Sequence, residues 1–323
     1  MNEVIVSVII PIYNEEQHIA KCLESLEKQT YPKDRLECIL VDGGSKDKTL
    51  EIIDSFAQRM PIKVFHNEKR LVTYALNIGV ENAIGKYIVR FDAHSGYSPD
   101  YIEKCVYYLE NTDADNVGGV AETKGEGFIG EINADILSSK FGVGNSSFRT
   151  EEKNGYVDTV PFGAYRREIF DKIGKFNPDL PRSEDNDFNS RIRESGGKVF
   201  LSTDIRFTYY CRNTVKGLLS QGIKNGNALF LTLKANPKAM SLRHYIPFLF
   251  VLSLIAMPII SIFLPFLWWA FATEIFCYTV LNFYFSLFKG KKKYFFVKIF
   301  LYPLFHIVYG IGSLLGMLGI KLY

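Results

Sequence analysis

The charge pattern of this chain changes sharply near Arg243. Before it, polar and apolar segments alternate, whereas from residue 245 to 288 charged residues nearly vanish and Phe, Leu, Ile and Trp dominate. Such a stretch exceeds the ~20 apolar residues that one membrane-spanning helix needs. The hydrophobic content of 47% is also high for a purely soluble protein. We therefore expect a soluble part followed by a membrane module.

Three apolar segments, residues 245–268, 270–288 and 294–320, are each near the length of a membrane-spanning helix. The dense basic loop between the second and third runs from Lys289 to Lys293, and such loops stay in the cytoplasm. With two spans before that loop, the soluble part also faces the cytoplasm. We expect a multi-pass protein of the cytoplasmic membrane with two to three transmembrane helices. Glu274 in the second segment is either a paired, functional acid or an acid near the interface.

The soluble part begins with an alternation of strand and helix patterns. Residues 4–12, 36–41, 62–65 and the run from Tyr87 read as buried strands, and residues 19–26, 47–56 and 71–84 between them have helical spacing. Glu15 and Glu16 are expected in the first turn of the first helix. Because the first apolar run is short and lacks a basic leader, we expect a core strand and not a signal peptide. This alternation predicts an α/β fold with a parallel sheet.

The pattern then becomes less regular. We expect a helix at 99–110, a strand through 118–120, a mobile glycine-rich loop at 122–155, a strand at 157–162, helices at 167–173 and 184–194, and strands at 199–201 and 206–210. Residues 214–234 have amphipathic helical spacing, which suits either a helix on a membrane surface or one that closes the soluble domain. The expected domains are 1–213, an interfacial region at 214–243, and a membrane module at 244–323.

Polar side chains follow the strands of the expected parallel sheet. In open α/β sheets ligands bind beyond the carboxyl ends of the strands, so Tyr13, Asp42 and Asp92 are expected at one edge. Asp42 precedes two glycines and either contacts a ligand or caps a tight turn. Asp92 and His94 suit Mg²⁺ or Mn²⁺ completed by substrate phosphates, although His94 could instead be a hydrogen-bonded loop histidine.

An acidic cluster opens the expected helix at 184–194. Glu184 and Asp185 could serve as capping acids, because helix amino termini favour carboxylates. They could also supply a general base, with Asp187 as the rival residue for that role.

Several function classes are excluded. A net charge of +3 without a basic patch argues against nucleic acid as a partner. Five widely spaced cysteines read as buried thiols of a reducing compartment, without structural zinc. A dinucleotide-dependent oxidoreductase is rejected because no GxGxxG follows the first strand.

Four motifs in order resemble those of the family 2 glycosyltransferases of the GT-A fold, and most of all bacterial succinoglycan or exopolysaccharide enzymes. They are VSVIIPIYNEEQHIAKCLESLEKQTYP, ILVDGGSKDKT, KYIVRFDAHSGYSPD and SEDNDFNSRIRESGGKV, and the resemblance extends over about residues 4–235. It implies an inverting transfer of a sugar from a UDP-sugar or GDP-sugar, with Mg²⁺ or Mn²⁺, to a lipid-linked saccharide during cell-surface polysaccharide synthesis at the membrane.

The resemblance also implies roles for residues. Pro11, Tyr13 and Glu15 would line the nucleotide pocket, and Asp42 would contact the base or ribose. Asp92 would sit at the metal and diphosphate, with His94 where the family usually has Asp.

On the acceptor side, Asp185 would be the catalytic base with Glu184 beside it, and the loop at 122–155 would close over the donor. The QxxRW motif of processive synthases is incomplete at Gln221, which favours a single addition. Two alternatives are a transferase that loads a sugar onto polyprenyl phosphate and a non-catalytic membrane scaffold that keeps the fold.

Overall fold

The computed structural model describes residues 3–150 and 153–322, and the chain divides into two compact units. The first unit contains the described residues up to Glu122 together with residues 153–210. The second contains Thr123–Thr150 and the described chain from Cys211 onward. The segment 123–150, which lies inside the range expected for the catalytic domain, therefore groups with the C-terminal helices.

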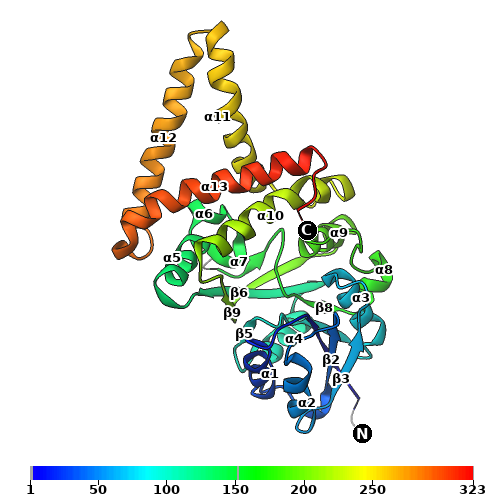
Figure 1. Ribbon diagram of the computed structural model, residues 1–323. Coiled ribbons are helices and arrows are strands. Elements are labelled where there is room, and N and C mark those ends of the chain that lie inside the picture. Colours follow the sequence, from blue (N-terminus) through cyan, green and yellow to red (C-terminus); the bar gives the residue numbers. More distant parts are fainter. Residues whose placement is uncertain (1–2, 151–152, 323) are drawn as a thin grey trace. The chain divides into compact units, whose positions relative to one another are not determined.

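The first unit is built on a parallel half-sheet. Its strands are ordered β3-β2-β1-β4, and all three neighbouring pairs are parallel. The strands are β1 (Val6–Ile12), β2 (Leu36–Asp42), β3 (Ile62–His66) and β4 (Tyr87–Arg90). The helices between and after them are α1 (Ile19–Glu27), α2 (Thr49–Ala57), α3 (Val72–Asn82) and α4 (Tyr101–Asn111), with a short 3-10 turn at Lys33–Arg35. The expected α/β alternation is confirmed (Figure 1).

An antiparallel half continues the same sheet beyond β4. The order there is β4-β8-β6-β9-β5, with β7 paired to β9. These strands are β5 (Ser95–Tyr97), β6 (Asn116–Lys124), β7 (Gly155–Tyr156), β8 (Ala164–Arg166) and β9 (Val199–Tyr210), with helices α8 (Glu168–Ile173) and α9 (Glu184–Glu194). The sheet is thus mixed, and its parallel half is the part that periodicity predicted.

Burial explains why these segments form the sheet. Every residue of β2 and all but one of β1 are buried, because the two central strands are covered on both faces, as apolar β-branched runs require. The outer strand β3 is mostly exposed, which fits its edge position.

Several element predictions were wrong in detail. Helix α1 starts at Ile19, so Glu15 and Glu16 lie in the preceding turn and not in its first turn. The strand expected at 157–162 is absent from the described residues, because Pro161 cannot donate to a ladder and Phe162 takes a left-handed φ of 50°. The two strands expected at 199–201 and 206–210 are one strand, β9.

The glycine-rich segment expected as a loop is largely helical. It contains α5 (Gly127–Leu137), α6 (Lys140–Val143) and α7 (Ser147–Thr150), while residues 151–152 of the expected loop lie outside the described residues. Ile132 and Ile136 are both fully buried, and their spacing of four is a helix signal that the glycines obscured.

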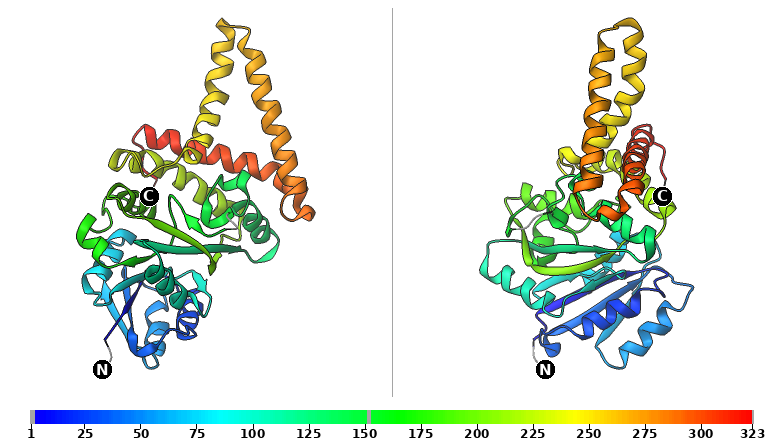
Figure 2. Two further views of the ribbon diagram at one scale, coloured as in Figure 1. Left: turned by 180° about the vertical axis from the view of Figure 1, so that it is seen from behind. Right: turned by 90° about the vertical axis from the view of Figure 1, so that its left-hand side faces the viewer.

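The second unit also holds four long helices: α10 (Val215–Ala235), α11 (Ile246–Phe263), α12 (Leu267–Phe288) and α13 (Phe295–Met317), with 3-10 turns at Leu242–His244 and Lys292–Tyr294. Three helical stretches, Leu242–Phe263, Leu267–Phe288 and Lys292–Met317, are long and apolar enough to cross a membrane. Within this unit α11 and α12 form a hairpin, and α13 runs across its base beside α10 (Figures 1 and 2). Glu274 accepts a hydrogen bond of 2.5 Å from Ser253 Oγ, which pairs this acid inside the hairpin.

Candidate active site

The carboxyl ends of β1, β2 and β4 meet at one edge of the first unit. Residue Ile12 of β1 lies opposite Asp42 of β2, and Ile9 lies opposite Arg90 of β4, so the three strands end close to one another. Tyr13, Asp42 and Asp92 stand at these ends, as expected from the sequence. A ligand in an open α/β sheet binds at such an edge.

His94 lies between two carboxylates at this edge. Its Nδ1 is 2.8 Å from Asp92 Oδ1 and 3.6 Å from Glu15 Oε1. Its backbone N–H also donates to Asp92 Oδ1 at 3.3 Å. Burial alone would lower the pKa of His94, but Asp92 and Glu15 outweigh it and hold that pKa well above its usual value. Burial would raise the pKa of Asp92, and His94 with Arg90 reverses that shift to a net lowering.

Asp92 is also fixed through its backbone. Tyr97 Oη accepts the Asp92 N–H at 2.6 Å, and the Tyr97 ring stacks on Phe91 with centroids 3.5 Å apart. The turn that carries Asp92 is therefore anchored in the core, which holds its carboxylate at the strand end.

Asp42 orders the loop that follows β2. Its carboxylate accepts hydrogen bonds from Gly44 N at 3.0 Å, from Ser45 N at 3.1 Å and from Ser45 Oγ at 2.6 Å. Gly44 has a φ of 81°, a conformation that glycine adopts without strain. The turn-capping role that the sequence left open is thus present, at the position expected of a nucleotide contact.

Tyr13 and Glu15 line the approach to the strand ends, and Pro11 lies within β1 opposite Val41. Tyr13 is 42% exposed, and its ring lies so close to Gly43 that a Cβ there would be 3.2 Å from Tyr13 Cδ2. An exposed aromatic ring against a glycine backbone offers a flat surface for a planar ligand group. The Glu15 backbone N–H is held by Thr49 Oγ1 at 2.7 Å.

Arg90 joins the end of β4 to the start of α9. Its Nη1 donates to Asp185 Oδ1 at 2.6 Å and its Nη2 to Glu184 Oε1 at 2.8 Å. The Arg90 side chain is only 5% exposed, so both ion pairs are shielded from water. Arg90 was not among the site residues predicted from the sequence, although an arginine directly after the apolar run Tyr87–Val89 is a signal for a paired, functional cation.

The environment of Asp185 tunes its acidity. Burial raises its pKa, Arg90 lowers it, and the nearby carboxylates of Glu184 and Asp92 raise it again, so that it reaches about 7. A general base works best when its pKa lies near the operating pH. Asp185 can therefore accept a proton at neutral pH and release it again.

Asp187, the rival candidate base, has a different environment. It is 2% exposed, and its carboxylate accepts from Arg191 Nε at 3.0 Å one turn along α9. The Asp187 side chain is 3% exposed and the Asp185 side chain 18%, so Asp185 is the more accessible of the two to a substrate hydroxyl and the better candidate. Ser183, at the start of α9, has a φ of 62°, a strained left-handed value for a residue other than glycine.

The donor atoms at this edge suit a cation that arrives with a diphosphate. No group of three or more His, Cys, Asp or Glu side chains in residues 3–150 and 153–322 is arranged to hold a metal by itself. Mg²⁺ is commonly bound by one or two carboxylates together with substrate phosphates. Both contacts from His94 reach Asp92 Oδ1, so a metal at this edge would be held through Asp92 Oδ2. The residues therefore fit a metal completed by the substrate.

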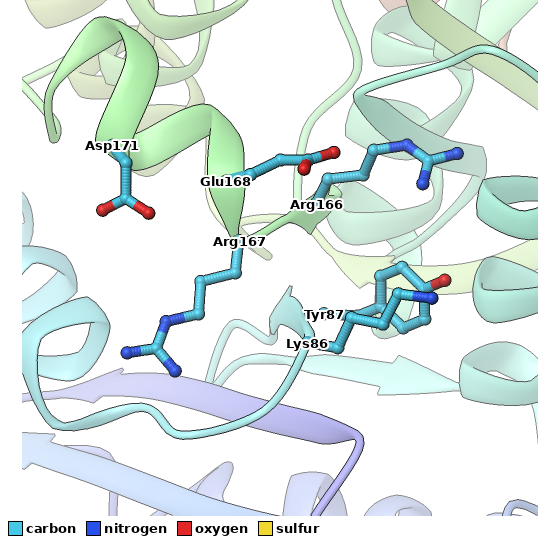
Figure 3. Close-up of a pocket in the computed structure, with 6 residues that line it drawn as sticks. All are labelled: Lys86, Tyr87, Arg166, Arg167, Glu168 and Asp171. Atoms are coloured by element: carbon cyan, nitrogen blue, oxygen red, sulfur yellow. The ribbon is translucent and has the colours of Figure 1, made fainter.

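A separate pocket lies at the opposite end of β4. Its lining is Lys86, Tyr87, Arg166, Arg167, Glu168 and Asp171 (Figure 3). Tyr87 is the first residue of β4, whereas Asp92 follows its last residue, so this pocket is not part of the candidate site.

Comparison with known proteins identifies relatives of this architecture. The sequence model described as Glycosyl transferase family 2 matches residues 7–174. A dolichyl N-acetyl-alpha-D-glucosaminyl phosphate 3-beta-D-2,3-diacetamido-2,3-dideoxy-beta-D-glucuronosyltransferase of Methanococcus voltae is 32% identical over 238 residues, covering 71% of this chain and 74% of that protein. The succinoglycan biosynthesis protein ExoA of Rhizobium meliloti is 30% identical over 246 residues, covering 74% of this chain and 73% of that protein.

Solved structures show the same fold. The mannosyltransferase PcManGT from Pyrobaculum calidifontis, solved in complex with GDP-Man and Mn²⁺, is similar with a TM-score of 0.64 at 18% identity. The similarity covers 97% of this chain and 88% of that one. The mixed sheet with flanking helices is thus the GT-A fold that the sequence motifs implied.

Proposed function

Because this chain belongs to the family 2 glycosyltransferases, we propose that it moves a sugar from a UDP-sugar or GDP-sugar to a lipid-linked saccharide, with inversion at the anomeric carbon. The observation that carries this proposal is the ion-paired cluster at the end of β4. It sets Asp185, with a pKa of about 7, beside the strand end that bears Asp92.

The donor side of the site is assigned to the strand ends of the parallel half-sheet. Pro11, Tyr13 and Glu15 line the nucleotide pocket, and the exposed Tyr13 ring offers a surface for the base. Asp42 helps to bind the nucleotide because its carboxylate orders the following loop. The ribose or base then lies against Gly43 and Gly44 of that loop.

Asp92, with His94 as its partner or co-ligand, would hold a Mg²⁺ or Mn²⁺ ion together with the diphosphate. When bound, such an ion neutralises the charge that develops on the leaving diphosphate. Because His94 Nδ1 lies 2.8 Å from Asp92 Oδ1 and the raised pKa of His94 favours the protonated ring, His94 would chiefly orient this carboxylate, and a role as second ligand would require the neutral imidazole.

The transfer step assigns one role to each acid of α9. Asp185 takes the proton from the acceptor hydroxyl while the hydroxyl oxygen attacks the anomeric carbon from the face opposite the diphosphate. The new carbon–oxygen bond forms as the bond to the diphosphate breaks, and its electron pair leaves with the nucleoside diphosphate. A single displacement of this kind inverts the anomeric centre. Glu184, held by the same arginine, lies beside the base on the acceptor side.

A lipid-linked saccharide is the favoured acceptor for two reasons. The relative from Methanococcus voltae is named for action on a dolichyl phosphate sugar, and the one from Rhizobium meliloti for succinoglycan biosynthesis. The candidate membrane helices would also keep the chain at the surface where such acceptors are found. We place the catalytic domain in residues 1–213, an interfacial region in 214–243 and a multi-pass membrane module in 244–323, with the catalytic domain facing the cytoplasm.

The proposal is tested with the purified full-length chain in detergent. Thermal shift with a panel of UDP- and GDP-sugars, with Mg²⁺ or Mn²⁺, identifies the donor. Transfer is then measured to a synthetic lipid-linked disaccharide and to polyprenyl phosphate, since faster transfer to the second would favour direct loading of the lipid.

The matched variants are Asp185→Asn and Asp179→Asn, because Asp179 is an exposed acid outside the site. We expect loss of transfer in Asp185→Asn only. Full transfer by that variant would refute the base assignment. An absence of binding to any nucleotide sugar in the wild-type protein would instead favour a non-catalytic scaffold.

A further inference from the structure

The third candidate membrane helix, α13, is packed along most of its length inside the second unit. Near its start, Lys298 is fully buried, and its Nζ donates to Asp135 Oδ2 of α5 at 2.7 Å and to the Lys289 carbonyl at 2.9 Å. Near its middle, His306 Nε2 is 2.9 Å from the Phe141 carbonyl of α6. A helix that crosses a bilayer at right angles moves away from the surface after its first turns. Contacts with α5 and α6 would then be confined to the start of the helix.

Helix α10 accompanies α13 further along. Gly222 faces Phe305, Gly226 faces the Tyr309 carbonyl, and the backbones are so close that a Cβ on Gly226 would overlap that carbonyl. Small residues permit this kind of close backbone approach between helices.

The contact continues to the end of α13. Gly312 and Gly316 meet the carbonyls of Ile223 and Asn227, so the facing residues advance in the same direction along both helices. Asn227 Nδ2 donates to the Ile320 carbonyl at 2.7 Å, and the Leu322 N–H donates to Asn227 Oδ1 at 3.1 Å. The two helices therefore run parallel and share one depth.

The composition of α10 indicates whether the two helices lie at the membrane surface or in the hydrocarbon core. It carries Lys216, Lys224 and Lys234 at its start, middle and end. If α13 crossed the bilayer, α10 would cross beside it and bring these charges and Asn227 into the hydrocarbon. A charged side chain at the centre of a spanning helix costs at least ~2.5 kcal/mol. A surface helix has no such cost.

The remaining face of α13 is apolar and exposed. It consists of Phe296, Phe300, Leu304 and Ile311, which are 78%, 76%, 41% and 39% exposed, and it continues into Leu318 just past the helix end, which is 70% exposed. We call these five residues the α13 stripe. One apolar face opposite a packed face is the arrangement of a helix that lies in a membrane interface.

From these contacts we propose that α13 lies in the plane of the membrane surface and does not cross the bilayer, with the α13 stripe turned toward the lipid. The C-terminal end then lies on the same side of the membrane as the basic loop at Lys289–Lys293. Among the candidate spans of the described residues, α11 and α12 then remain as crossing helices. The left view of Figure 2 shows this hairpin standing upright while α13 runs across its base.

Cysteine labelling in membrane vesicles tests this arrangement in the full chain. The native Cys22, Cys38, Cys105 and Cys211 are buried, so a Cys277→Ser background removes the one exposed thiol among the described residues. Lys292→Cys and Lys321→Cys are then made singly and treated with a membrane-impermeant maleimide, in inverted and in right-side-out vesicles. The Cys277→Ser protein without an introduced cysteine is the control for labelling of native thiols. Labelling after solubilisation in detergent gives the full reactivity of each introduced cysteine.

We expect both variants to label in the same vesicle orientation. Labelling of the two positions in opposite orientations would overturn the proposal, because α13 would then cross the bilayer between them.

A depth measurement gives a second readout. Leu304 lies near the middle of Lys292–Met317, whereas Phe296 lies near its start. We place a fluorophore on Phe296→Cys and on Leu304→Cys in separate proteins, with spin-labelled lipids as quenchers. The in-plane arrangement predicts the same ratio of shallow to deep quenching at both positions, with the shallow label as the stronger quencher. Stronger quenching of position 304 by the deep label would show a crossing helix and refute the proposal.

Discussion

Replacing Arg90 with methionine should move the pH dependence of transfer. Arg90 holds Asp185 and Glu184 through one hydrogen bond each, in a buried setting. Methionine fills a similar volume without charge. The variant therefore leaves two carboxylates close together, near the carboxylate of Asp92, with no cation between α9 and β4.

The size of the effect follows from these contacts. Removing one partner of a buried ion pair costs about 3–5 kcal/mol if the remaining charge stays ionised. The protein avoids most of that cost by protonating Asp185, the acid whose pKa is already about 7. A further rise of about 2 pKa units corresponds to about 2.7 kcal/mol, well within that range.

The direction in which activity changes with pH follows from the role of Asp185 as a base. The deprotonated form is active, so activity rises as pH rises through the pKa of Asp185. If that pKa moves from about 7 to about 9, the active fraction at pH 7 falls roughly fifty-fold, and most of it returns above pH 9. Arg90→Lys keeps the charge but not the fork that binds two carboxylates, so a smaller shift is expected.

The assay is kcat against pH with saturating donor and acceptor, for the wild type and both variants. Thermal unfolding at each pH confirms that the variants are folded. An equal loss of rate at every pH, with an unchanged midpoint, would refute this reasoning, because Arg90 would then act on the fold and not through the acidity of Asp185.

Other predictions concern the metal and the second unit. Asp92→Ala should abolish transfer, and EDTA should abolish transfer by the wild type until Mn²⁺ is restored. His94→Ala should keep the metal dependence of the wild type if Asp92 alone is the protein ligand. Titration of the activity of each protein with Mn²⁺ tests these expectations. Lys298→Ala removes the buried cation that pairs with the part-buried Asp135 carboxylate and should lower the free energy of unfolding in detergent by about 3 kcal/mol, because the Lys291 N–H still binds that carboxylate. Gly226→Ala should cost about 1–3 kcal/mol in the same measurement, whereas Gly155→Ala, with open space around it, should be nearly neutral.

The parallel half of the sheet could be predicted because its signals are local. Buried strands appear as apolar runs, and the helices between them show their own spacing, so the strand ends and their polar residues follow directly. Asp42 and Asp92 were found in this way. Their common edge required only the rule that parallel strands end on the same side.

The pairings inside the site could not be predicted, because they join residues far apart in sequence. Arg90 and Asp185 are separated by 95 positions, and no periodicity links them. The contact of His94 with Glu15 likewise depends on how the turn after β1 meets the turn after β4. Glycines in the segment that contains α5 also masked a helix whose two buried isoleucines lie one turn apart.

The α/β class, the family and the presence of apolar helices could all be inferred from the sequence, since each depends on composition and order along the chain. Folding brings Glu184 and Asp185 of α9 onto Arg90 of β4, and it covers one of the apolar helices with polar neighbours. The hydropathy of a helix shows that its side chains favour an apolar environment. It does not show whether lipid or the rest of the protein provides that environment. For α13 the neighbours are the Asp135 carboxylate of α5, which pairs with Lys298 of α13, and the charged helix α10. Contacts of that kind exist only after the chain has folded.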